Sequence, residues 1–279
     1  MSHRETYAAT RDTVRPHQTP QPFVAIKDKR DTAVLVTGFP TGIFAANCYV
    51  VAAEPGAECV VVDPGQDAAP AVAEVVREHR LKPVAVLLTH GHLDHMWAVL
   101  PVCGSYDAVC WVHPGDRGML ADPLAGLPPE WAAALLGSGE RFAEPDDVRE
   151  LSDGVIIEVA GLSFTVDHTP GHTPGSVTFR TPYTRPSRHT GGIAGLRMRP
   201  DEDDPPELMF AGDLLFAGSI GRTDLPGGDH QAMLTSLATK VLPLDDRIAV
   251  LPGHGDATTI GRERRSNPYL QGLQAPSRP

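Results

Sequence analysis

The sequence predicts an α/β protein, because short apolar runs typical of strands recur along the chain and a helical pattern stands among them. The first half shows strands, then a helix, then a strand, an order that favours sheets covered by helices. The second half is rich in further strand-like runs, which is compatible with a duplicated pair of sheets. The chain has 279 residues, of which 41% are hydrophobic, and a chain of this length can bury a large core.

The first half supplies four expected strands and one helix. The strands are expected at residues 33–37, 47–53, 58–62 and 84–88. The third strand ends in the turn Asp63-Pro64-Gly65, and the fourth is an unbroken apolar run typical of a buried strand. A helix is expected over residues 67–80, because Val72 and Val75 stand at helical spacing, with Asp67 as its N-cap.

The second half contains shorter strand-like runs separated by long loops. Strands are expected at residues 110–112, 155–159, 162–166, 176–180, 208–211 and 248–251, and a short helix at 131–136. Stretches rich in proline at 122–147 and 182–206 are expected to be loops, and both are candidates for covering a substrate. The polar residues 1–30 are expected to form a disordered tail, and residues 31–279 a single domain with a long loop at 182–206.

Charge and composition exclude several classes of protein. The formal net charge of −11 argues against a nucleic-acid partner, which needs a basic face. No apolar run approaches the roughly 20 residues that cross a bilayer, and residues 1–22 contain no hydrophobic secretory segment. The four cysteines are too sparse for a disulfide scaffold and form no Cys-x-x-Cys pair, so we expect reduced thiols and a cytoplasmic protein.

The strongest chemical signal is the segment Thr89-His90-Gly91-His92-Leu93-Asp94-His95. It follows the expected buried strand at 84–88 directly, and loops at strand ends are where α/β proteins place functional groups. Imidazole and carboxylate are ligands that borderline divalent metals prefer. Because two alternating histidines are followed by an Asp-His pair, the segment can supply ligands to two neighbouring metals.

Three isolated residues share this local context. Each follows an expected strand and a glycine: His172, Asp213 and His254. Glycine permits the close backbone approach that a crowded site needs. A single histidine of this kind is most often a loop or core residue, but four matching segments in one chain favour a metal site.

Taken together, these residues resemble the pattern of the metallo-β-lactamase superfamily over about residues 33–270. The resemblance implies an αββα sandwich, in which two mixed sheets lie between outer helices and the metals lie at one edge. It implies a first metal held by His90, His92 and His172 and a second held by Asp94, His95 and His254, with Asp213 bridging the two. It also implies that the carboxylate of Asp63 orients a ligand histidine.

Within the superfamily, two segments resemble those of glyoxalase II-type hydrolases, the hydroxyacylglutathione hydrolases: residues 210–216 and 219–224. This resemblance places Arg222 and Asp224 at the rim of the site. Full-length glyoxalase II adds a C-terminal helical domain that supplies much of its glutathione site. Only residues 255–279 follow His254 here, so we expect the compact type of glyoxalase II-like hydrolase.

The resemblance implies a dinuclear metal-dependent hydrolase, a thioesterase that acts on hydroxyacyl thioesters of a low-molecular-weight thiol. Two divalent ions are expected, zinc first and iron or manganese as alternatives, and such ions activate water near neutral pH. Asp94 and Asp213 are the expected catalytic carboxylates. The thiol leaving group has a pKa of about 8.5 and therefore needs little protonation. The expected partner is a small thioester, and neither nucleic acid nor a membrane.

One alternative is a persulfide dioxygenase-like oxidoreductase, whose single iron would be held by His90, His172 and Asp213. A nuclease or tRNA-processing enzyme is disfavoured by the acidic balance, and a periplasmic β-lactamase by the lack of a secretory segment. A non-catalytic metal-binding domain is disfavoured by the complete set of ligands. The acyl group, the thiol, the metal identity and the oligomeric state stay open at this point.

Overall fold

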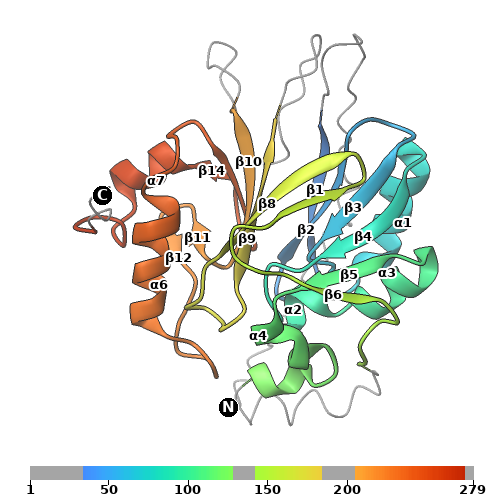
Figure 1. Ribbon diagram of the computed structural model, residues 1–279, viewed down its shortest axis with the longest axis horizontal. Coiled ribbons are helices and arrows are strands. Elements are labelled where there is room, and N and C mark those ends of the chain that lie inside the picture. Colours follow the sequence, from blue (N-terminus) through green and yellow to red (C-terminus); the bar gives the residue numbers. More distant parts are fainter. Residues whose placement is uncertain (1–33, 128–141, 184–204, 274–279) are drawn as a thin grey trace, which may run out of the picture.

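The computed structural model describes residues 34–127, 142–183 and 205–273 of the chain (Figure 1). The expected tail at 1–30, the expected helix at 131–136 and most of the expected loop at 182–206 lie outside these ranges. The described strands form two six-stranded sheets and a two-stranded ribbon.

The first sheet contains the strands of the N-terminal half in chain order, from β1 to β6. They are β1 Leu35–Thr41, β2 Ala46–Ala52, β3 Glu58–Val62, β4 Lys82–Leu87, β5 Val109–Val112 and β6 Val148–Glu150. Strands β1 to β3 pair antiparallel, and β3 to β6 pair parallel. Parallel strands need crossover connections, and helices lie in those connections: α1 Ala68–His79, α2 Leu93–Met96, α3 Val99–Tyr106, α4 Pro114–Arg117 and 3-10 turns at Gly118–Leu120 and Pro123–Gly126.

The second sheet has the order β14-β13-β10-β9-β8-β7. Its strands are β7 Ile156–Val159, β8 Leu162–His168, β9 Val177–Pro182, β10 Glu207–Gly212, β13 Ala249–Pro252 and β14 Thr258–Thr259. Only the pair of β10 with β13 is parallel among these described strands. Between β10 and β13 the chain forms the ribbon of β11 Leu215–Phe216 with β12 Ser219–Ile220, then α6 His230–Ser236 and a π-helical turn, Leu237–Val241; α7 Ile260–Ser266 follows β14.

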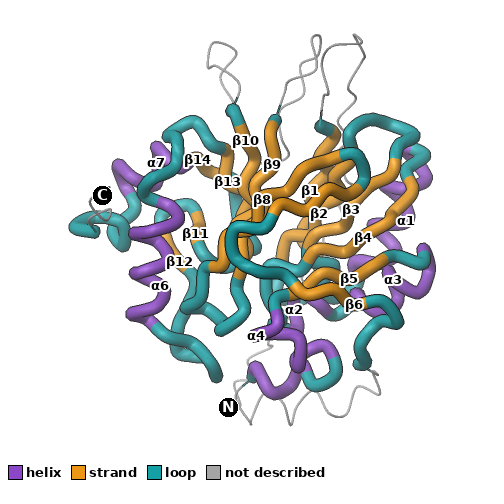
Figure 2. Tube along the Cα trace, viewed as in Figure 1, coloured by secondary structure: helices purple, strands orange, loops and turns teal. Residues whose placement is uncertain are grey.

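Helices cover the outer face of each sheet, and the two inner faces meet (Figures 1 and 2). Val51 and Val60 of the first sheet share one apolar core with Phe164, Phe179 and Phe210 of the second. A second core lies between the first sheet, α1 and α3, and a third lies between the second sheet, α6 and α7. Successive strand residues point to opposite faces, so central strands such as β2, β3 and β10 contribute to two cores. The expected αββα sandwich with two mixed sheets is confirmed.

The sequence pattern misses several short elements. Helices α2, α3, α6 and α7 have no more than eight residues each, and β6, β11, β12 and β14 have no more than three. Helices this short draw their stability from tertiary packing rather than from intrinsic propensity. In α3, for example, Val99, Val102 and Cys103 are buried against the first sheet. These residues are helical because they pack on that sheet, and a local sequence pattern does not show this packing.

The expected N-cap role of Asp67 is wrong. Asp67 does precede α1, but its backbone is left-handed, with φ of 60°, and its side chain makes no capping hydrogen bond. A capping side chain reaches the first turn from an extended backbone, which this residue does not adopt. The Ala68 N–H instead donates to the Gly65 carbonyl at 3.1 Å, so the turn after β3 begins the helix.

Reduced cysteines and the lack of a membrane-spanning segment are both expected from the sequence. Cys48, Cys59, Cys103 and Cys110 are all free thiols and all buried. Across the three described ranges, no helix combines the length and apolar character needed to cross a bilayer.

The two sheets are joined by hydrogen bonds at one edge. The Asn47 N–H donates to the Gly253 carbonyl, and the Val177 N–H donates to the Thr89 carbonyl, both at 2.7 Å. Helix α2 lies at this edge, at the bottom of Figure 1. Residues 184–204 connect β9, which ends at Pro182, to β10, which begins at Glu207. Both of these strand ends lie far from the joined edge, at the other end of the sheet. The described ends of the 182–206 loop therefore give no support to its candidacy as a cover over the site.

Candidate metal centre

The segment after β4 is fixed by a buried carboxylate on the neighbouring strand. Asp63 follows β3 and accepts hydrogen bonds from the Thr89 N–H at 2.8 Å and from the Thr89 hydroxyl at 2.6 Å. The chain then passes His90 and His92 and begins α2, where the His95 N–H donates to the His92 carbonyl at 3.0 Å. This tight turn brings the ligand-type side chains of the segment to one side.

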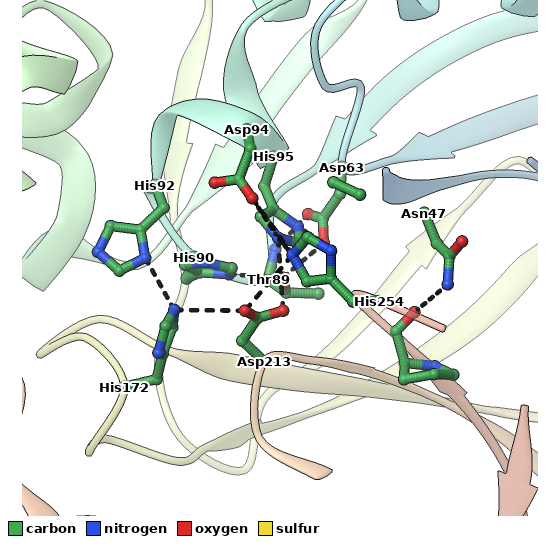
Figure 3. A network of polar contacts seen from close by, with 12 residues as sticks. Asn47, Asp63, Thr89, His90, His92, Asp94, His95, His172, Asp213 and His254 are labelled. Carbon is green, nitrogen blue, oxygen red and sulfur yellow. Dashed lines mark hydrogen bonds and ion pairs between the residues drawn. The ribbon is translucent and has the colours of Figure 1, made fainter. Parts of the chain in front are cut away.

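The other three expected ligands come from the second sheet and face this segment (Figure 3). His172 lies between β8 and β9, Asp213 follows β10, and His254 follows β13. An isolated bridge between Ala46 and His254 ties the last of these loops to the first sheet. The seven residues therefore meet where both sheets end.

Contacts between the expected ligands are short. His92 Nδ1 lies 2.8 Å from His172 Nε2, and His254 Nε2 lies 3.2 Å from Asp94 Oδ2 and 3.3 Å from His95 Nε2. Asp213 lies between these two groups: its Oδ2 is 3.5 Å from His172 Nε2, and its Oδ1 is 3.4 Å from His95 Nε2.

Three sets of these side chains have ligand atoms close enough together to hold one ion. They are His90 with His92 and His172, Asp94 with His95 and His254, and Asp63 with His90 and His95. The first two sets are the ones that the sequence pattern implies. In the third set, Asp63 already accepts hydrogen bonds from Thr89, so we assign it to support rather than to ligation.

The hydrogen bonds behind the histidines fix which ring nitrogen faces the centre. The Thr89 hydroxyl gives its only proton to Asp63, so it can only accept from His90 Nδ1, at 3.1 Å. His95 Nδ1 lies 3.1 Å from Asp63 Oδ2, and His172 Nδ1 lies 2.7 Å from the Arg222 carbonyl. Each of these Nδ1 atoms then carries the proton, and each Nε2 turns a lone pair toward the centre.

Buried polar atoms without hydrogen-bond partners support a metal at this place. Those that face the centre are His90 Nε2 and Asp213 Oδ1, whereas His92 turns its Nδ1 toward His172. Buried polar atoms are rarely left unpaired, since that costs about 1–3 kcal/mol each. A divalent cation would satisfy imidazole lone pairs and a carboxylate oxygen together. The donor set therefore fits the two ions that the sequence pattern implies.

The pKa values of His90, His92 and Asp94 agree with ligands ready to bind a cation. Burial alone would lower the pKa values of His95 and His254, but the carboxylates of Asp94 and Asp213 outweigh it and raise both. These two imidazoles must therefore lose a proton to bind metal. Burial lowers the pKa of His92 to about 3 and holds that of His90 well below its usual range, with neighbouring histidines adding to the effect. Burial alone would raise the pKa of Asp94, but His95 and His254 outweigh it and hold that pKa low. Neutral imidazoles and an ionised carboxylate are the protonation states that bind metal.

Asp116 is a buried residue of the centre that sequence reasoning missed. It lies in α4, and only 1% of it is exposed. Its Oδ2 accepts from the Gly91 N–H at 2.9 Å and from the Thr173 hydroxyl at 2.6 Å, and its Oδ1 accepts from the Gly175 N–H at 2.7 Å. One carboxylate thus joins the loop of His90 and His92 to the loop of His172. Its position after β5, next to β4 in a parallel sheet, was the available signal.

The expected rim residues Arg222 and Asp224 form an exposed ion pair. Arg222 Nε lies 2.7 Å from Asp224 Oδ1, and Arg222 Nη2 lies 2.8 Å from Oδ2. Their side chains are 50% and 69% exposed. Arg222 lines the cavity over the centre, whereas Asp224 is not among the lining residues.

A cavity of about 640 Å³ opens over the centre. Its volume is within the range of small-molecule sites. The residues that line it are Phe44, His92, Leu93, Asp94, Leu127, His172, Asp213, Phe216, Ser219, Ile220, Arg222, Leu225 and His254. Leu127 belongs to the expected loop at 122–147, so a described part of that loop does border the site.

An αββα sandwich that gathers histidines and aspartates at the ends of its strands, below a cavity, defines a metallo-hydrolase type of protein. The chain belongs to the metallo-β-lactamase superfamily, whose profile matches residues 41–185 and 202–254.

Relatives agree with this assignment. An uncharacterised protein of Mycobacterium tuberculosis is 47% identical over 241 residues, covering 86% of this chain and 99% of its own. The hydroxyacylglutathione hydrolase GloC of Haemophilus influenzae is 34% identical over 237 residues, covering 83% and 95%. The crystal structure of the BLEG-1 B3 metallo-β-lactamase superposes with a TM-score of 0.67 at 35% identity, covering 85% of this chain and all of that one.

Proposed function

We propose that this protein is a dinuclear metal-dependent thioesterase that hydrolyses acyl thioesters of a low-molecular-weight thiol. The observation that carries the proposal is the pair of ligand sets with Asp213 between them at the base of the cavity. The similarity to a hydroxyacylglutathione hydrolase over most of both chains supports the same reaction class. A reducing compartment such as the cytoplasm suits four free cysteines and a reaction that releases a thiol.

Each group of the centre has a defined task in this proposal. His90, His92 and His172 would hold one ion, and Asp94, His95 and His254 the other. Divalent ions, zinc or alternatively iron or manganese, supply activation of water and stabilisation of negative charge on a carbonyl oxygen. Asp213 lies between the two ligand sets. There its carboxylate can orient the attacking water toward the substrate and accept a proton from that water.

Among the described residues of the cavity wall, no separate acid stands ready to protonate a leaving group, which favours a thioester over an ester or amide. Among the described lining residues, the titratable side chains are five expected ligands and Arg222. Arg222 is paired with Asp224, and an arginine does not give up its proton near neutral pH. A thiolate leaves without general-acid assistance because the thiol pKa is about 8.5, whereas an alkoxide or amine needs a proton.

The deciding experiment measures metal content and three activities on the same preparation. S-lactoylglutathione is assayed by thiol release, a cephalosporin by β-lactam opening, and glutathione persulfide by oxygen uptake. We expect close to two metals per chain and thiol release. His92→Ala and Asp213→Ala should lose both metal and turnover while far-UV circular dichroism is unchanged. One iron per chain with oxygen uptake alone would replace the proposal with the dioxygenase, and β-lactam opening alone would replace it with a lactamase.

A further inference from the structure

Outside the metal centre, most of the described wall of the cavity is apolar. Six side chains supply it: Phe44, Leu93, Leu127, Phe216, Ile220 and Leu225. Leu93 and Ile220 are buried, with 2% and 9% exposed, so they form a fixed lining. The remaining lining residues outside the centre are Ser219 and Arg222.

One aromatic side chain of this wall stands next to the expected ligand His254. The Phe216 ring lies edge-on to the His254 ring, with centroids 6.1 Å apart and planes at 77°. Phe44 is two residues before Ala46, which pairs with His254. Phe44 is 43% exposed and the adjacent Ile43 is 78% exposed. Large apolar side chains that border a cavity and face water favour binding of an apolar ligand there.

Charge at the cavity disfavours a substrate with several anionic groups. Within the described lining, the single cation is Arg222, and its guanidinium already pairs with both oxygens of Asp224. Asp94 and Asp213 at the base are expected metal ligands, so divalent ions bound there would offset their charge. Away from the centre, desolvating a carboxylate or phosphate against the apolar wall without a matching cation is costly. The described wall therefore offers apolar contact and little to pair with an anion.

We propose that the substrate of this centre is a thioester that carries an apolar chain of several carbons, and that the chain binds against Phe44, Phe216 and their apolar neighbours. The inference rests on the proposed thioesterase function and specifies its substrate class. The apolar chain can belong to the acyl group or to the thiol, since the two groups are joined by the C–S bond that is cleaved.

Two series of thioesters test the proposal and distinguish these sources. The first lengthens the acyl group on the neutral thiol N-acetylcysteamine, from acetyl to butanoyl to hexanoyl. The second keeps the acetyl group and lengthens an alkyl thiol from ethyl to hexyl. Burying one methylene contributes about 0.8 kcal/mol, which is about a fourfold gain in kcat/KM. We expect one series to rise at least tenfold from its shortest to its longest member, and the longest to exceed S-lactoylglutathione.

Variants of the wall link the length dependence to named residues. Phe216→Ala and Phe44→Ala should flatten the rising series to less than half its slope, whereas Phe216→Leu should restore most of it. Ile156→Ala is the matched control, because Ile156 is also apolar and 57% exposed but lies on β7 outside the cavity lining. Metal content per chain, measured for every variant, should stay at the wild-type value, which separates loss of the wall from loss of the centre.

Two results would overturn the inference while leaving the thioesterase in place. One is equal kcat/KM along both series, and the other is a preference for S-lactoylglutathione over every neutral thioester. Failure of all these thioesters with a protein that holds two metals would instead overturn the proposed function itself. The assays therefore separate a wrong substrate class from a wrong reaction.

Discussion

Asp116 Oδ2 accepts a hydrogen bond of 2.6 Å from the hydroxyl of Thr173, in the loop that follows β8. Asp116 lies in α4, which follows a strand of the first sheet, Thr173 lies in a loop of the second sheet, and neither residue is more than 1% exposed. The same carboxylate accepts from the backbone N–H between His90 and His92, in the segment after β4. The distance between the two histidine loops is thus held by one buried charge.

Asp116→Asn should loosen the first ligand set. Asparagine keeps the size of the side chain but replaces one acceptor oxygen by a donor, so at least one of three charge-assisted hydrogen bonds is lost. Each is worth about 1.5–3 kcal/mol, and loss of a group that orients ligands commonly weakens metal binding 10- to 100-fold. We expect about one metal per chain after dialysis, instead of two. The visible spectrum of the cobalt-loaded protein would report the change at the centre directly.

The control for this change is Asp122→Asn, because Asp122 is exposed and makes no side-chain capping bond at the turn it precedes. Wild-type metal retention and an unchanged cobalt spectrum in Asp116→Asn would show that the carboxylate is only structural.

Asp63→Asn should weaken the second ligand set more than the first, because Asp63 contacts His95 directly and reaches His90 only through Thr89. The Asp63 carboxylate faces His95 Nδ1 at 3.1 Å and holds Thr89 through two further hydrogen bonds. Asparagine tolerates the left-handed backbone of this residue, with φ of 49°, so the main effect is electrostatic. We expect metal affinity at the Asp94, His95 and His254 set to fall about 10- to 100-fold. A calorimetric titration with zinc measures binding at the two sites separately. Two binding events with wild-type affinities would contradict the assignment.

Gly253→Ala should distort the centre through close contact. A Cβ at this residue would meet Asp213 Oδ1, and it would lie 2.7 Å from His95 Cε1. Neither side chain can move away without leaving its ligand position, so we expect loss of bound metal and at least a 100-fold loss of turnover.

The matched control is Gly104→Ala. Gly104 lies in α3, and a Cβ there would meet nothing within 4 Å. This substitution should keep the metal and raise the free energy of unfolding by about 0.5–1 kcal/mol. Both substitutions add one methyl group, so a difference in metal content between them isolates the effect of position.

Removal of metal should destabilise the folded protein. The centre brings five histidines close to one another and to the carboxylates of Asp94 and Asp213, and buried lone pairs then face one another without a cation. A metal present at 100 times its dissociation constant stabilises the native state by about 2.7 kcal/mol per site. We expect a chelator to lower Tm by several degrees, and zinc to restore it. An identical Tm with and without the chelator would show that the sites hold no metal.

The sequence predicts the larger strands because their signal is local. β2, β4 and β8 carry β-branched and aromatic residues in short runs, and their strand character appears within those runs. The short helices α3, α6 and α7 could not be predicted in this way, since their apolar residues are too few to show a period and become helical by packing on a sheet. Asp67 was misassigned because an N-cap depends on backbone angles as well as on residue type.

Residue chemistry is the part of the candidate centre that the sequence alone determined: imidazoles and carboxylates after strands, in the order typical of the superfamily. The tertiary structure decided which of them meet. His92 and His172 are 80 residues apart in the chain, and His95 and His254 are 159 apart, yet each pair is in contact. It also decided the roles of Asp116 and of the Arg222 carbonyl, and the apolar wall of the cavity. Such contacts arise from the packing of two sheets against each other, and no local pattern in the sequence encodes the distance between segments that meet only after folding.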